Sequence, residues 1–289
     1  MIQSANRRKI ICPQRLNITI KPPQGGFSYL IKTEAGLPNL LSSRQLLDRI
    51  IEALTRKTPL SVVSVGATEA FVMAQYELFS ETEIIGHPEA LIANRGERQG
   101  FNHRGIRFPN IAARDQAVEA VRKADIIGYN TLIESAKTLT ERVLHAYSIT
   151  PSDLFESNLR RVIMFSQPDR FKAMLRGRRL LLIGSPAPMV RQALQNPYRQ
   201  DLSCEIVGAI PIYEFEDIPR VLDSISSYEF DLCLLAAGVN ALILAPYIAQ
   251  SFSKVAFDIG WGMESLVTGR VVLDQWLAYL IGIENIMGM

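Results

Sequence analysis

Four mostly apolar stretches in this chain each end at a glycine, and the fourth also carries Asp258. Such runs are typical of strands that are buried on both faces of a sheet. A helical pattern follows the first three, and strands that alternate with helices indicate βαβ units. The sequence therefore predicts an α/β fold, with a Rossmann-like, mostly parallel sheet and helices on both faces. The glycines that end these runs are Gly66, Gly184, Gly238 and Gly260.

The remaining elements are predicted from periodicity and turn residues. Strands are expected at residues 60–65, 124–130, 161–165, 180–184, 204–209, 232–237 and 254–260, and helices at 42–54, 67–76, 80–86, 112–123, 134–148, 189–196, 215–226, 241–249 and 275–283. Residues 87–110 are polar and are expected to form a long loop. Proline and glycine interrupt residues 1–43, which predicts an irregular N-terminal extension ahead of one domain at 44–289.

Composition excludes several classes of protein. The 289 residues are 48% hydrophobic, which is enough for one large or two small domains. The 31 basic and 29 acidic residues nearly balance, so neither nucleic acid nor an anionic membrane is an expected partner. The uncharged stretch 232–249 is interrupted by Gly238, Asn240 and Pro246, and we expect a buried strand and helix there, with no membrane span. We expect the protein to be cytoplasmic. The sequence is also compatible with a homo-oligomer.

The ends of the predicted strands are the natural place for a ligand. In open α/β sheets, ligands bind outside the carboxyl ends of the strands, where small residues allow close approach. After Gly66, a helix begins with Glu69 in its first turn. Helix N-termini attract phosphate. A carboxylate beside a phosphate implies either a metal ion between them or hydrogen bonds from Glu69 to sugar hydroxyls.

The stretch from Gly66 to Glu69 resembles the strand, Gly-Asp-x-Glu, helix signature of the GT-D fold glycosyltransferase family. The resemblance covers residues 45–268 and extends to three further segments and to the Gly-x-Arg-x-Pro stretch that ends at Pro109. Two positions depart from the family: Ala67 replaces the aspartate, and Trp261 replaces a histidine near the end of the fold. The three further segments are 180–184, 237–240 and 255–260.

The resemblance implies a glycosyltransferase that moves a sugar from a nucleotide-sugar, a UDP-sugar in this family, to a hydroxyl of a glycan or glycoprotein. It implies a divalent metal, manganese or magnesium, held by Glu69 and Asp258, which are also the expected catalytic residues. The residues expected to bind the donor are Gly66, Thr68, Gly184, Gly238, Arg107 and Trp261.

Two other interpretations stay open. Ala67 and Trp261 replace residues that resemble catalytic residues in the family. The alternative interpretation is therefore a catalytically degenerate protein that binds a ligand or serves as a scaffold. Another Rossmann-like transferase is the third alternative. The sequence contains neither a Walker A motif nor Gly-x-Gly-x-x-Gly, which disfavours an ATPase and a dinucleotide oxidoreductase.

Overall fold

The computed structural model describes residues 38–96, 103–195, 202–272 and 282–289. These residues belong to the compact unit Pro38–Met289. The predicted extension up to residue 37 and nearly all of the predicted helix 275–283 lie outside the described residues. The first strand, β1 (Asn39–Leu41), already belongs to the sheet, so the sheet begins before residue 44.

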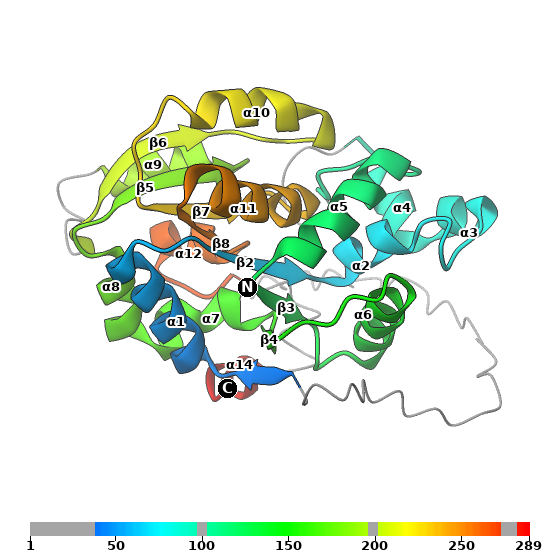
Figure 1. Ribbon diagram of the computed structural model, residues 1–289, viewed down its shortest axis with the longest axis horizontal. Helices are drawn as coiled ribbons and strands as arrows, with labels where there is room; N and C mark the ends of the chain where they lie inside the picture. The colour runs from blue at the N-terminus through cyan, green and yellow to red at the C-terminus, as the bar shows by residue number, and fades with distance from the viewer. Residues whose placement is uncertain (1–37, 97–102, 196–201, 273–281) are drawn as a thin grey trace, which may run out of the picture. The chain divides into compact units, whose positions relative to one another are not determined.

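The described strands form one eight-stranded sheet in the order β1-β4-β3-β2-β8-β7-β5-β6, and the neighbouring strands pair in parallel (Figure 1). This confirms the predicted parallel α/β sheet. The further strands are β2 (Leu60–Val65), β3 (Ile126–Tyr129), β4 (Asp153–Glu156), β5 (Arg179–Gly184), β6 (Glu205–Ile210), β7 (Leu232–Ala236) and β8 (Val255–Asp258).

Helices cover both faces of this sheet, as predicted. One apolar core lies under α2 (Ala67–Ala74), α5 (Ile111–Lys123), α6 (Glu134–Ala146), α10 (Ile218–Ile225) and α11 (Val239–Phe252). The opposite core lies under α1 (Ser43–Arg56), α7 (Leu159–Ser166), α8 (Pro168–Leu175), α9 (Ala187–Leu194), α12 (Gly262–Thr268) and α14 (Ile283–Met287). The short helices α3 (Glu81–Gly86), α4 (Pro88–Ala93) and η2 (Phe215–Asp217) complete the described elements.

The central strands explain why the sequence shows unbroken apolar runs. Along β7, Cys233 and Leu235 pack into one core, whereas Leu232 and Leu234 pack into the other. Successive side chains of a strand point to opposite faces, so a strand covered on both faces needs apolar residues throughout. Within the described ranges, no helix is long and apolar enough to cross a membrane, and stretch 232–249 forms β7 and part of α11.

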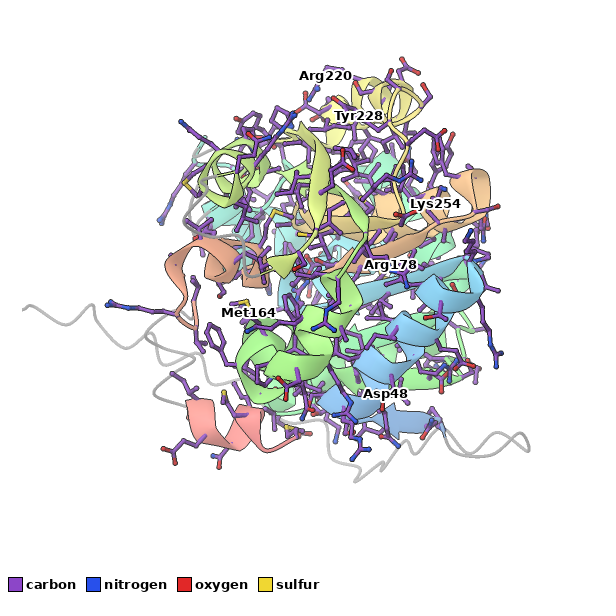
Figure 2. All side chains as sticks on the ribbon, turned by 90° about the vertical axis from the view of Figure 1, so that its left-hand side faces the viewer. Asp48, Met164, Arg178, Arg220, Tyr228 and Lys254 are labelled. Carbon is purple, nitrogen blue, oxygen red and sulfur yellow. The ribbon has the colours of Figure 1, made fainter. Side chains whose placement is uncertain are left out.

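A surface ion pair joins two helices of the second layer. Nε of Arg170 in α8 donates a hydrogen bond to Oδ1 of Asp48 in α1 at 2.8 Å. Figure 2 shows Asp48 on the exposed side of α1. An exposed pair of this kind contributes little to stability.

Two predictions about local structure are wrong. Residues 161–165, predicted as a strand, lie in helix α7, whose buried residues Leu159, Val162 and Ile163 have helical spacing. The strand in this region is β4, which is only four residues long and has an acid at each end, so it lacks an apolar run. The expected loop 87–110 contains helix α4, which begins at Pro88, a favoured first residue of a helix.

Two neighbouring strands in the centre of the sheet lead into helices on opposite faces. β2 and β8 pair in parallel, but β2 leads into α2 on one face and β8 leads into α12 on the other. β7, on the other side of β8, leads into α11 on the same face as α2. Such a switch point at the carboxyl ends of parallel strands is the usual ligand position in open α/β sheets.

Candidate functional site

Glu69 lies at the carboxyl end of β2, in the first turn of α2. Its Oε2 accepts a hydrogen bond from the N–H of Gly66 at 3.0 Å, which satisfies one of the free donors of the helix N-terminus. The side chain is buried, and the residue is 8% exposed. A Cβ atom on residue 66 would lie 2.7 Å from this oxygen, so the carboxylate position requires glycine before the helix.

Asp258 is the last residue of β8 and is 2% exposed. Its Oδ2 pairs with Nη1 of Arg160, and its Oδ1 accepts a hydrogen bond from the N–H of Gly260 at 3.1 Å. A buried carboxylate without such partners would cost several kcal/mol. The two contacts therefore allow an aspartate at this end of the sheet.

Arg160 is a residue of this site that sequence reasoning missed. It lies in α7, with a side chain only 14% exposed. It also lies beside the turn after β8, because a Cβ on Gly260, where φ is 51°, would be 3.1 Å from the guanidinium. The helical spacing of Leu159, Val162 and Ile163 was the available signal, since it would have predicted α7 in place of a strand.

The charged groups at this end of the sheet influence one another. Burial raises the pKa of Glu69 above its ordinary value of 4.5, whereas Arg160 opposes this rise and the charges of Asp258 and Glu89 add to it. Burial likewise raises the pKa of Asp258, and Arg160 again acts in the opposite direction. One guanidinium thus stabilises the ionised form of two buried carboxyl groups.

The donor set does not suit a resident divalent metal. Magnesium in proteins usually has one or two carboxylate ligands with free oxygens, together with waters and phosphates. Here Asp258 is already paired with Arg160, and Glu69 accepts the Gly66 amide. No group of three or more His, Cys, Asp or Glu residues that could hold a metal occurs in the described part of the chain. The expected metal on Glu69 and Asp258 stays an untested prediction.

Two of the expected donor-binding side chains have protein partners. The hydroxyl of Thr68 donates to Oε2 of Glu89 at 2.7 Å, and the same oxygen accepts from Nε of Arg104 at 2.8 Å. Nη2 of Arg107 lies 2.5 Å from Oε1 of Glu214, a residue that follows β6 at the edge of the sheet. The structure therefore holds Thr68 beside α4 and directs Arg107 toward β6.

Two of the expected glycines allow close approach within the protein itself. A Cβ on Gly184, where φ is 151°, would lie 2.2 Å from the carbonyl oxygen of Ala236 in the neighbouring strand. A Cβ on Gly238, where φ is 56°, would lie 2.9 Å from the carbonyl oxygen of Arg104. These contacts explain both glycines without a ligand. Their assignment to donor binding stays a prediction.

The switch point therefore brings together four of the residues singled out in the sequence. Gly66 and Glu69 follow β2, while Asp258 ends β8 and Trp261 begins the turn into α12. Trp261 is partly exposed, as is Gly66. Ala67, where the resemblance would predict an aspartate, is exposed.

Comparisons with known proteins agree with this architecture. A sequence model of the GT-D fold-like domain matches residues 41–266. A solved structure, described as "The highly conserved domain of unknown function 1792 has a distinct glycosyltransferase fold", is similar to this chain with a TM-score of 0.52 and 14% identity. The alignment covers 81% of this chain and 83% of that one. No curated protein matches the chain significantly.

Proposed function

Because the chain belongs to the GT-D fold-like domain family, we propose that it is a glycosyltransferase that moves a sugar from a nucleotide-sugar to an acceptor hydroxyl. The observation that carries this proposal is the cluster at the carboxyl ends of β2 and β8, where the carboxylates of Glu69 and Asp258 share the field of Arg160. Charged groups that converge at a switch point are typical of a binding site.

Glycosyl transfer needs groups that such a cluster can supply. The departing nucleoside diphosphate gains negative charge, which fixed positive groups stabilise. Carboxylates accept hydrogen bonds from sugar hydroxyls or remove a proton from the acceptor. In this proposal Glu69 contacts the donor, and Asp258 serves as a base or as a second polar contact. Trp261 lies on the adjoining turn, where its ring can stack on a sugar or a base.

The donor and acceptor are proposed from the family alone. A UDP-sugar is the expected donor, and a glycan or glycoprotein is the expected acceptor. The nucleotide would lie above Gly66, since the exposed Ala67 leaves that helix end open.

One observation favours a second candidate, a binding protein without transferase activity. Ala67 removes one carboxylate of the family signature, and the carboxylate of Asp258 is already paired with Arg160. A protein of this kind would bind the nucleotide-sugar without releasing UDP. Release of UDP from a UDP-sugar in the presence of candidate glycan acceptors separates the two functions.

Thermal unfolding with a nucleotide panel tests the proposed donor class. The panel contains UDP, UDP-glucose, ATP, NAD and S-adenosylmethionine. Ligand at about 100 times its Kd adds about 2.7 kcal/mol, which corresponds to roughly 4–5 °C in Tm for a chain of 289 residues. UDP or UDP-glucose should give this shift. A shift given only by ATP, NAD or S-adenosylmethionine, or by no member of the panel, would reject the proposal.

A further inference from the structure

The guanidinium of Arg160 has hydrogen-bonding capacity that the fold does not use. Its Nη1 pairs with Asp258, and in the described part of the chain no other hydrogen-bond partner contacts this group. A guanidinium carries several N–H donors in a planar fork. The side chain is 14% exposed, and its Nε and Nη2 are not among the fully buried polar atoms without a partner, so these two donors reach the surface while Nη1 stays paired with Asp258.

The surroundings fix this guanidinium in place. Asp258 accepts its hydrogen bond from one side, and Gly260 gives it room on another, where a Cβ would approach three of its atoms at 3.1–3.3 Å. A side chain with few alternative positions loses little entropy when it binds a ligand. The planar fork also matches a phosphate group, to which arginine can form two parallel hydrogen bonds.

The same contacts leave little opportunity for a metal ion. Ala67 has no ligand atom at the position of the family's aspartate, and Asp258 Oδ2 is occupied by Arg160. Glu69 remains, but its Oε2 accepts the Gly66 N–H. A fixed cation thus pairs with one of the two carboxylates that the resemblance assigns to a divalent ion, and its charge acts on the other.

We propose that Arg160 binds the diphosphate of the donor directly, and that this chain therefore binds nucleoside diphosphates without a divalent metal. The inference rests on the proposed nucleotide-sugar site. Asp258 then acts as a positioning residue, because it orients the guanidinium. Glu69 remains available for the sugar.

Isothermal titration of UDP into the full chain tests the inference, once with EDTA and once with manganese. The wild type should bind UDP in EDTA, and manganese should change the Kd by less than about twofold. Hydrogen bonds to charged groups contribute about 1.5–3 kcal/mol, so Arg160→Ala should weaken UDP binding by about 10–100-fold. Arg170→Ala is the matched control, because it also removes an arginine paired with an aspartate but lies in α8.

A second variant tests the role of Arg160 even if Arg160→Ala does not fold. Arg160→Ala leaves a buried Asp258 unpaired, whereas Arg160→Met combined with Asp258→Asn removes both charges together. This double variant should unfold near the wild-type temperature and should still bind UDP about 10–100-fold more weakly.

Two results would overturn the inference in distinguishable ways. If UDP binds only with manganese, or binds Arg160→Met/Asp258→Asn as tightly as the wild type, the donor site stands and the role of Arg160 is wrong. If neither UDP nor UDP-glucose binds the folded wild type under either condition, the proposed donor site is itself rejected.

Discussion

The N–H of Gly66 donates a hydrogen bond to Oε2 of Glu69 at 3.0 Å, so one carboxylate both caps α2 and lies at the carboxyl end of β2. The hydrogen bond thus both stabilises the start of α2 and positions a residue of the proposed donor site. It places Glu69 where a ligand above the sheet would meet it. It also makes the residue before the helix sensitive to any added side chain.

Gly66→Ala is expected to move this carboxylate and leave the fold intact. The added Cβ would lie 2.7 Å from Glu69 Oε2, and the flexible glutamate can shift at a cost of about 1 kcal/mol. Loss of one hydrogen bond to the carboxylate should weaken UDP-glucose binding by about tenfold, as measured by titration. Gly86→Ala is the control, since its Cβ would have no atom within 4 Å. Equal affinities in both variants would contradict a role for Glu69 in binding.

Glu69 should make the stability of the protein depend on pH in a defined direction. Burial raises its folded pKa above 4.5, so folding favours the protonated carboxyl. Its contribution is therefore complete below about pH 4.5 and is lost as the pH rises through the folded pKa. The groups that share this field are Arg160, Asp258 and Glu89.

Urea unfolding of the wild type and Glu69→Gln from pH 4 to pH 8 measures this effect. Glutamine resembles the protonated acid, so the free energy of unfolding of the wild type minus that of the variant should decrease as the pH rises. The carboxylates with lowered pKa, Glu83, Asp217 and Asp231, are present in both proteins and cancel in the difference. A difference that stays constant or increases would show that Glu69 is not held in a raised-pKa environment.

Gly184→Ala should lower the stability of the sheet, because Gly184 has a structural role there. Its Cβ would lie 2.2 Å from the Ala236 carbonyl oxygen, which is rigid backbone of β7, and φ is 151°. Overpacking and backbone strain together predict a loss of at least about 2 kcal/mol in the free energy of unfolding. Chemical denaturation measures this, with Gly86→Ala expected to stay within about 0.5 kcal/mol of the wild type. A Gly184→Ala protein of full stability would favour the predicted donor-binding role instead.

Thr68→Val separates structure from donor binding at another predicted position. The hydroxyl donates to Glu89 at 2.7 Å, so its loss should lower stability by about 0.5–1.5 kcal/mol. UDP-glucose affinity should change by less than about threefold, because this hydrogen-bonding group already has a protein partner. A tenfold loss of affinity at unchanged stability would instead assign Thr68 to the donor.

The sequence predicted the parallel sheet because its central strands are buried on both faces. The polar residues of β2, β5, β7 and β8 are two buried serines in β2 and one charged residue at an end of β5 and of β8, and a helix begins directly after Gly66. β4 was not predicted, because its four residues have an acid at each end and do not form an apolar run. Its neighbour α7 was consequently taken for the strand.

The sequence predicted only those site residues that lie at the end of a recognisable strand. Glu69 and Asp258 were identified because each follows or ends a recognisable strand. Arg160, which pairs with Asp258 and acts on Glu69 through its charge, was not identified, because it lies 98 residues before Asp258 and the order of the strands brings the two together. Likewise, the partners of Thr68 and Arg107 are distant residues, Glu89 and Glu214, which no local pattern connects to them.

Titration of UDP-glucose into the wild type and two isosteric variants tests the central claim most directly. Glu69→Gln keeps an acceptor for the Gly66 amide but removes the charge at the switch point, whereas Glu284→Gln makes the same change at an exposed position in α14. A donor site at β2 and β8 predicts that the wild type and Glu284→Gln bind alike and that Glu69→Gln binds at least about tenfold more weakly. Wild-type affinity in Glu69→Gln, or no binding to any of the three folded proteins, would contradict it.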